Sequence, residues 1–396
     1  MMPDREPGGF DLPSVLVLGG GRWARVIAET LLGLLTESTP LLMASPAGAR
    51  DLVHWIEQKG YGHRIAIVER HLLTLPRGAA VVVANAARGH VEAASWALRQ
   101  GASVLVEKPL ALTVGDARLL ERIALQNNAL LAPALVFRFA QFIDDFAMHV
   151  ASGSQPGHVE LVWQDGAAEH RHGEEKRYDP GVSVIEDCLP HALAIFASTI
   201  GTEPQLVGLD VQRGGARVDL KLADAAHSFA VTLERNGPGR RRIMRATSAT
   251  DNVELDFTAE PGLLRHNGVL RARSLPSPQE RPLAHMLRVF LSAATGGAVD
   301  ARLSMQQSLH SAQVIEHAMS AYRIAALEQL ESGLDGADLN YAMAELLQRE
   351  GRLTSDQLEL AAAALRRRLA EREAAIDQAS IAVMVRNARD EVGGSG

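Results

Sequence analysis

Short apolar runs alternate with amphipathic helical segments over the first 136 residues. Runs such as 14–18, 80–84 and 104–106 are too short for buried helices, and each leads toward a segment whose apolar residues recur at helical spacing. Strands that alternate with helices at this pitch predict a parallel sheet with right-handed crossovers. We therefore expect an α/β domain, a doubly wound parallel sheet of the Rossmann type, over residues 1–136. The other expected elements are strands at 40–44, 65–68 and 129–136 and helices at 91–100 and 114–127.

The pattern changes after residue 136. One long helix is expected at Val182–Ile200, and two amphipathic helices at Pro282–Ala294 and Ser304–Tyr322. Strands that follow one another without helices between them predict an open antiparallel sheet, so residues 137–326 form an expected α+β domain. Clusters of Gly, Pro, Asn and Asp separate the expected strands, which are Val159–Gln164, Leu206–Gln212, Arg217–Leu222, Ser228–Arg235, Arg241–Thr247 and Val253–Phe257.

Residues 327–396 form a third region, for which we expect a helical C-terminal appendage. Leu339–Arg349 and Thr354–Ala375 have helical periodicity, and Thr354-Ser355-Asp356-Gln357 carries a capping-box signal. The apolar stripe of such helices needs a cover. The protein's own body, a second subunit or a partner protein could supply it, and a homo-oligomer is our preferred expectation.

Composition narrows the class of protein. With 47% hydrophobic and 22% charged residues among 396, the chain is typical of a globular protein, and no stretch of about eighteen apolar residues predicts a membrane span. Met1–Leu12 lacks an apolar signal-peptide core, so a cytoplasmic location is the expectation. The single cysteine, Cys188, excludes an intramolecular disulfide and a cysteine-cluster metal site. A net charge of −7 argues against nucleic acid as a partner.

The first candidate site is the glycine turn after residues 14–18. Gly19, Gly21 and Ala24 fit the dinucleotide fingerprint with alanine at its third position. Gly19 permits a tight turn, Gly21 lets a pyrophosphate approach bare backbone, and a small residue at position 24 lets the helix lie against the strand. A flexible turn is the alternative. The position of the glycine turn between an expected strand and an expected helix favours a nucleotide site over a flexible turn.

The residues after the second expected strand bear on cofactor preference. A site that prefers NAD usually has an acid here, whereas this chain has Ser45. Arg50 follows and could accept a 2′-phosphate, although it could also face solvent, and Asp51 lies beside it. We therefore expect NADP(H) to be preferred over NAD(H).

Two further motifs carry candidate chemistry. Glu107-Lys108-Pro109 follows the apolar run 104–106, which places Lys108 at the carboxyl end of a parallel strand, where α/β sheets bind ligands. Asp187 and His191 lie four residues apart, on one face of the expected helix. By themselves these residues could be a solvated lysine, a helix-capping acid and a buried structural histidine.

Together with Asn85 to His90 and Arg138-Phe139, these motifs resemble the Gfo/Idh/MocA oxidoreductase family over roughly residues 14–322. The resemblance implies a Rossmann domain, an α+β domain, a nicotinamide cofactor and hydride transfer at a carbinol, carbonyl or imine carbon of a small polar substrate such as a sugar or cyclitol. It also implies that His191 is the general acid/base, that Asp187 orients it, and that Lys108 donates a hydrogen bond to the reacting oxygen. A cofactor-binding sensor or scaffold that recruits a partner through the C-terminal helices is the alternative.

The candidate ligand contacts follow from the motifs and the resemblance. Arg138, Arg177 and Tyr178 are the candidate substrate contacts. The candidate cofactor contacts are Gly19, Gly21, Arg22, Trp23, Ala24, Ser45, Arg50, Asn85, His90 and Glu107.

Some residues depart from the family pattern or remain outside it. Leu189-Pro190 stands where the family usually has a glycine, and Val136 where an asparagine is common, so we expect the substrate pocket to depart from the family pattern more than the catalytic set does. The charged segment 169–179 favours a solvated loop over a metal site. The run Arg240-Arg241-Arg242, with Arg245, predicts an exposed strand end.

Overall fold

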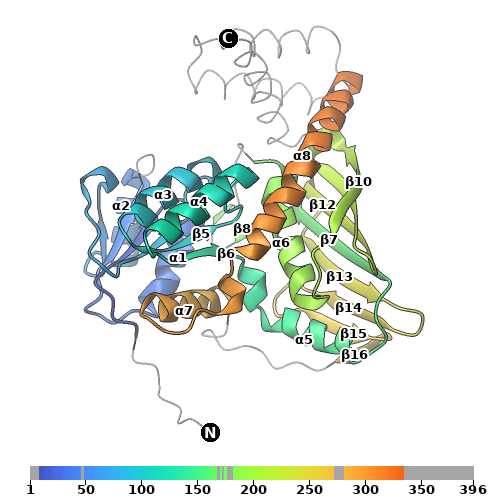
Figure 1. Ribbon diagram of the computed structural model, residues 1–396, viewed down its shortest axis with the longest axis horizontal. Coiled ribbons are helices and arrows are strands. Elements are labelled where there is room, and N and C mark those ends of the chain that lie inside the picture. Colours follow the sequence, from blue (N-terminus) through green and yellow to red (C-terminus); the bar gives the residue numbers. More distant parts are fainter. Residues whose placement is uncertain are drawn as a thin grey trace. The chain divides into compact units, whose positions relative to one another are not determined.

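The computed structural model describes residues 9–45, 49–166, 170–171, 174–175, 182–271 and 281–333. The chain divides into two compact units, which Figure 1 colours along the sequence. Unit 1 comprises residues 1–144 and 274–312, and unit 2 comprises residues 145–273 and 313–396. The predicted helical appendage lies outside the described residues, apart from the end of one helix.

Unit 1 contains a six-stranded sheet in which every pair of neighbours is parallel. The strand order is β3-β2-β1-β4-β5-β6, which is the order of a Rossmann fold. The predicted doubly wound domain is therefore confirmed. The strands are β1 (Val15–Leu18), β2 (Leu41–Ala44), β3 (Ile65–Ile67), β4 (Ala80–Val83), β5 (Ser103–Glu107) and β6 (Leu131–Ala134).

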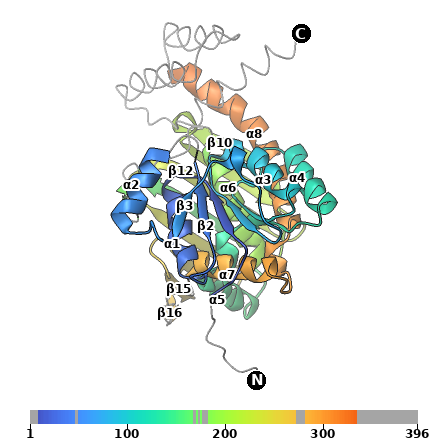
Figure 2. The same cartoon turned by 90° about the vertical axis from the view of Figure 1, so that its left-hand side faces the viewer.

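Helices cover both faces of this sheet. Successive side chains of a strand point to opposite faces, so each face presents apolar side chains for a layer of helices to bury. Val15 and Val17 belong to one apolar core, whereas Leu16 and Leu18 belong to the other. The first core contains α1 (Arg22–Leu32), α2 (Ala49–Lys59) and α7 (Pro282–Ala294). The second contains α3 (His90–Arg99) and α4 (Val114–Gln126), which lie side by side in Figures 1 and 2. Short 3-10 turns follow at η1 (Arg70–Leu72), η2 (Ala87–Gly89), η3 (Val136–Phe139) and η6 (Ala301–Leu303).

Helix α7 has the predicted bounds but belongs to unit 1, whereas the sequence placed it in the second domain. Met286, Leu287, Phe290 and Leu291 are all fully buried in the core that also contains Val15. The spacing of apolar residues shows that a helix needs a cover, but it does not show which sheet supplies that cover.

Unit 2 contains an eight-stranded sheet in the order β10-β11-β12-β7-β13-β14-β15-β16. Its strands are β7 (His158–Gly166), β10 (Gln205–Gln212), β11 (Arg217–Ala223), β12 (Ser228–Gly237), β13 (Arg241–Thr247), β14 (Asn252–Asp256), β15 (Leu263–His266) and β16 (Val269–Arg271). The sheet is mixed, so the expectation of an antiparallel sheet is wrong at one pair, β12 with β7. After β7 the chain passes through α6 (Val184–Thr199) to β10, and two reversals bring β12 back beside β7 in the same direction. The sequence did not predict β15 or β16.

Helix α6 packs against the face of this sheet formed by β11 and β12 (Figure 1). A capping box fixes its start, because the Ser183 hydroxyl accepts a hydrogen bond from the Glu186 amide at 3.1 Å and the Glu186 carboxylate accepts one from the Ser183 amide at 2.7 Å. The remaining elements are α5 (Gln141–Ala151), which the sequence did not predict, η4 (Arg213–Gly215), the pair β8 (His170–Arg171) and β9 (Glu174–Glu175), and α8 (Gln306–Gly333). Among the helices of the described ranges, none has the length and apolar character of a membrane span.

Candidate functional site

The turn between β1 and α1 requires glycine at its first position. Gly19 has φ +144°, and a Cβ atom there would lie 2.5 Å from the carbonyl oxygen of Ala84. Its amide also donates a hydrogen bond to the carbonyl of Ala44 at 2.9 Å. The turn is therefore wedged between the carboxyl ends of β2 and β4, and any side chain at position 19 would push them apart.

Past Gly19 the turn offers room and hydrogen-bond donors. Gly21 is the N-cap of α1, and no described atom lies within 4 Å of where its Cβ would be. No described side chain caps this helix, and Nη1 of Arg22 is buried without a hydrogen-bond partner in the described part of the chain. Ala24 is 1% exposed and lets α1 lie close to the sheet. These features fit a dinucleotide pyrophosphate, which would accept hydrogen bonds from the helix amides.

A second cluster lies at the end of β4. Oδ1 of Asn85 is buried and has no hydrogen-bond partner among the residues described, and a Cβ at Gly89 would meet Nδ2 of Asn85 at 2.4 Å. The His90 ring is 1% exposed, with Nδ1 2.8 Å from the carbonyl oxygen of Pro109 and Nε2 3.0 Å from that of Asn85. His90 thus joins the loop after β4 to the loop that holds Lys108.

Lys108 directly follows β5 and is partly exposed. The Glu107 carboxyl beside it is buried, and burial raises its pKa, against the hydrogen bond from Trp23 and the positive charge of Lys108, which lower it. Glu107 therefore ties the start of α1 to the end of β5. Trp23 and Glu107, which the sequence assigned to the cofactor, contact each other, and their cofactor role stays a prediction.

The residues of the NADP prediction lie at the carboxyl end of β2. Ser45 is partly exposed and directly follows Ala44, whose carbonyl accepts a hydrogen bond from the Gly19 amide. Ser45 therefore lies next to the glycine turn. Arg50 is exposed and lies in the first turn of α2. The cofactor preference stays a prediction.

In unit 2, Asp187 and His191 share helix α6. A carboxylate oxygen of Asp187 lies 2.9 Å from Nη2 of Arg235, which is 1% exposed on β12. Arg235 also donates to the carbonyls of Val182 and Ser183, at 2.9 and 3.1 Å. This arginine holds the start of α6 and the Asp187 carboxylate on the sheet. Sequence reasoning missed it, because position 235 only marked the end of an expected strand.

His191 is buried and stacks on Trp163 of β7, with the ring centroids 5.0 Å apart and the planes inclined by 18°. Arg242 of β13 places its Cζ 4.0 Å from the centroid of the same indole. Arg242 is 2% exposed and forms an ion pair with Asp165, which is 1% exposed. The predicted exposed strand end is therefore wrong at Arg242, although Arg241 is exposed.

The remaining predicted residues have separate placements. Lys108 belongs to unit 1 and the pair Asp187 and His191 to unit 2, so their common role stays a prediction. Arg138 donates to the carbonyl of Arg302 at 2.9 Å, and burial lowers its pKa. This contact holds η3 against η6, and a substrate role for Arg138 stays a prediction. Arg177 and Tyr178 lie outside the described residues.

Comparison with known proteins supports the reading of unit 1. Residues 14–134 match the GFO_IDH_MocA model, described as an oxidoreductase family with an NAD-binding Rossmann fold. The resemblance drawn from the motifs is thereby confirmed. No curated protein matches the sequence.

Solved structures share the fold over most of the chain. A 3-ketoreductase from Actinomadura kijaniata, in complex with TDP-benzene and NADP, has a TM-score of 0.64 at 18% identity over 76% of this chain and 95% of its own. An aldose-aldose oxidoreductase from Caulobacter crescentus has a TM-score of 0.62 at 19% identity over 78% and 97%. A UDP-N-acetylglucosamine 3-dehydrogenase from Acidithiobacillus ferrooxidans has a TM-score of 0.60 at 17% identity over 80% and 99%. At these identities the likeness establishes the two-domain fold.

Proposed function

We propose that the protein, whose residues 14–134 match the model of the Gfo/Idh/MocA oxidoreductase family, transfers a hydride between NADP(H) and a carbinol, carbonyl or imine carbon of a small polar substrate. The observation that carries the proposal is the turn at Gly19, where φ +144° and the nearby Ala84 carbonyl admit no side chain. Such a turn between the first strand and helix of a Rossmann sheet is suited to a dinucleotide.

The cofactor would be held by the amides at the start of α1, with Arg22 and Asn85 as further polar contacts. When bound, the nicotinamide supplies or accepts the hydride. Arg50 is the proposed partner of a 2′-phosphate, since no acid follows β2 at Ser45.

The proton chemistry is assigned to three side chains. His191 takes the proton from a substrate hydroxyl in oxidation and returns it to the oxygen in reduction. Lys108 donates a hydrogen bond to that oxygen as negative charge develops on it. Asp187 is proposed to orient His191, and its bond to Arg235 holds the carboxylate on this turn of α6.

A sugar or a related cyclitol is the proposed substrate class. Two of the similar structures carry names that state sugar chemistry, an aldose-aldose oxidoreductase and a UDP-N-acetylglucosamine 3-dehydrogenase. We also propose a homo-oligomer, which light scattering on the full chain would test.

Cofactor binding and turnover test the proposal in two steps. We expect NADPH to bind with a change in its fluorescence, and more tightly than NADH. Lys108→Ala and His191→Ala should keep that affinity and lose turnover by about a hundredfold or more, because each removes a group that acts in the transition state. Lys221→Ala, at an exposed position of β11, is the control and should match the wild type. Undiminished turnover in both site variants would refute the assigned roles.

The alternative is a cofactor-binding sensor or scaffold that recruits a partner through its C-terminal helices. It predicts intact NADPH binding without turnover across a panel of sugars, cyclitols and their keto forms. That result would replace hydride transfer as the proposed function while leaving the cofactor site in place.

A further inference from the structure

The rings of His191 and Trp163 form part of a stack inside unit 2. The imidazole lies over the indole at 5.0 Å between centroids, with the two planes only 18° from parallel. The ring of Phe257 meets the same indole edge to face, at 6.3 Å and 68°. The indole is 5% exposed and His191 is 8% exposed, so both residues are buried in the protein. A stacked arrangement of this kind restricts rotation of each ring about its Cβ–Cγ bond.

The indole itself is held by Arg242. β7 and β13 pair Trp163 with Arg242 across the ladder, and Cζ of Arg242 lies 4.0 Å from the indole centroid. The guanidinium is fixed in turn by the carboxylate of Asp165 and the backbone carbonyl of Gln164. Arginine suits this position because its planar group can stack on a ring and bind a carboxylate at once.

We propose that Trp163 is a positioning residue for His191, and that Arg242, anchored by Asp165, holds the indole in place. The proposal rests on the proposed function, in which His191 moves a proton. Proton transfer needs the ring nitrogen aligned with the substrate oxygen, and an error of about 1 Å in placement can cost on the order of a hundredfold in rate. The stack provides this alignment from the sheet side of α6, without touching the substrate.

Two substitutions at position 163 separate a stacking role from simple bulk. Trp163→Leu keeps an apolar side chain but removes the ring, and should lower kcat by about tenfold to a hundredfold while KM and NADPH affinity stay near the wild-type values. Trp163→Phe restores a ring that can stack, and should recover most of the lost turnover. A purely structural role predicts instead that both variants lose turnover in proportion to their lost stability.

A spectroscopic measurement needs no substrate. The Hε1 proton resonance of His191, assigned by its loss in His191→Gln, lies in the ring current of the indole. We expect Trp163→Leu to move this resonance downfield, Trp163→Phe to move it less, and Arg242→Lys to broaden or shift it, because lysine cannot stack as guanidinium does.

Phe229→Leu is the matched control. Phe229 of β12 contacts Phe196 of α6 with centroids 4.7 Å apart, so its loss also removes a buried aromatic contact between sheet and helix. It should lower stability while leaving kcat and the His191 resonance unchanged.

The outcomes are distinguishable. If no substrate is turned over by the wild type, the proposed function fails, and the resonance still reports whether Trp163 holds His191. If Trp163→Leu leaves both the resonance and kcat unchanged, or if Phe229→Leu changes them equally, the positioning role is overturned.

Discussion

The two faces of the sheet in unit 2 carry the same kind of ion pair in different surroundings. On β12, Glu234 and Arg235 are neighbours in sequence and therefore point to opposite faces. Arg235 reaches Asp187 on α6, and Glu234 binds Arg213 at the other face. The face that meets α6 is called the inner face below, and the opposite face the outer face.

The sheet's own charges on the inner face are nearly closed to solvent, whereas the Asp187 side chain on α6 is 25% exposed. Arg242 and Asp165 are 2% and 1% exposed, and Arg235 is 1% exposed. Each guanidinium also donates to backbone carbonyls, Arg235 to Val182 and Ser183 and Arg242 to Gln164. Every one of these contacts fixes a part of α6 or of the strand that carries Trp163.

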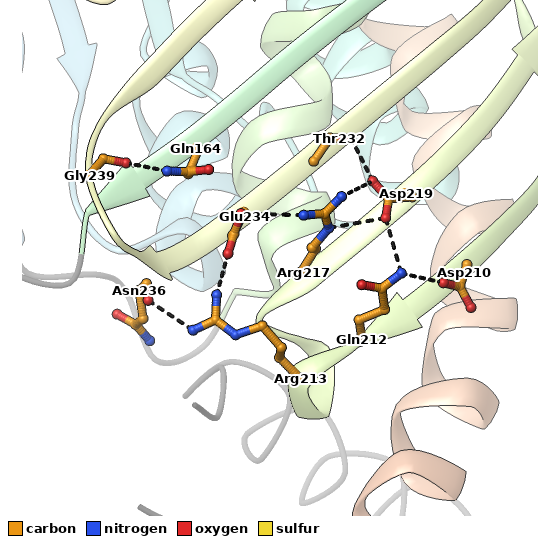
Figure 3. A network of polar contacts seen from close by, with 10 residues as sticks. All are labelled: Gln164, Asp210, Gln212, Arg213, Arg217, Asp219, Thr232, Glu234, Asn236 and Gly239. Atoms are coloured by element: carbon orange, nitrogen blue, oxygen red, sulfur yellow. Dashed lines mark hydrogen bonds and ion pairs between the residues drawn. The ribbon is translucent and has the colours of Figure 1, made fainter. Parts of the chain in front are cut away.

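Charges on the outer face form a shared network, which Figure 3 shows along β10, β11 and β12. Arg217 binds Asp219 at 3.1 Å and lies 3.9 Å from Glu234, and Asp219 also accepts hydrogen bonds from Thr232 and Gln212. Here Arg217 and Asp219 are 36% and 31% exposed. Water can replace a lost partner of Arg217 or of Asp219, so each bond of that pair is individually dispensable, whereas Glu234 on the same face is only 6% exposed.

The difference between the two faces teaches that burial, more than the number of hydrogen bonds, determines how much an arginine of this sheet contributes to stability. A buried pair must remain complete, because a charge left alone inside the protein is costly. A half-exposed pair is screened and adds little. The inner arginines can therefore hold the proposed catalytic helix in place, whereas the pair of Arg217 with Asp219 adds little to stability.

Arg242→Met should have the largest effect on stability, since it leaves Asp165 buried without its cation. We expect a loss of about 3–5 kcal/mol in the free energy of unfolding, measured by urea denaturation followed by circular dichroism. The double variant Asp165→Leu/Arg242→Met removes both charges and should recover most of that loss. Equal losses in the single and double variants would show that packing on Trp163, and not the unpaired charge, controls stability here.

Arg217→Met on the outer face should cost less than about 1 kcal/mol, because the pair with Asp219 is a third exposed and Gln212 and Thr232 still bind the carboxylate. The cost should shrink further in high salt, which screens exposed charges. Urea midpoints at low and high sodium chloride give the comparison. A loss as large as that of Arg242→Met would remove the distinction between the two faces.

The sequence predicted the parts of the molecule that follow from local pattern. The strand and helix periods, together with Gly19, Gly21 and Ala24, were enough for the Rossmann sheet and its glycine turn. The bounds of α7 were also predicted from its apolar spacing. Such features depend on residues close together in the chain, so a single sequence contains them.

The sequence could not predict contacts between distant strands. Arg242 stood in a basic run with no apolar alternation to mark it as buried, and only its pairing with Trp163 across β7 and β13 places it inside. Arg235 likewise gains its role from Asp187, 48 residues earlier. The parallel pair of β12 and β7 has the same origin, because strand order depends on long-range pairing.

Asp224→Asn tests a carboxylate of unit 2 whose hydrogen-bond donors do not include arginine, and we expect the smallest effect of the three substitutions. Burial raises the pKa of Asp224, but hydrogen bonds from Thr202, from the Ala226 and His227 amides at 2.7 and 2.8 Å, and from the His227 ring outweigh it and lower the pKa well below its usual range. A lowered pKa stabilises the fold above the unfolded value of about 3.9 and loses that contribution as the pH falls below it. In thermal melts from pH 7 down to about pH 2, the melting temperature of the wild type should therefore fall more steeply with acid than that of Asp224→Asn. Glu260→Gln, at an exposed position, is the control and should follow the wild type. Parallel acid curves for the wild type and Asp224→Asn would mean that the hydrogen bonds in this turn do not stabilise the Asp224 carboxylate more than they stabilise the protonated form.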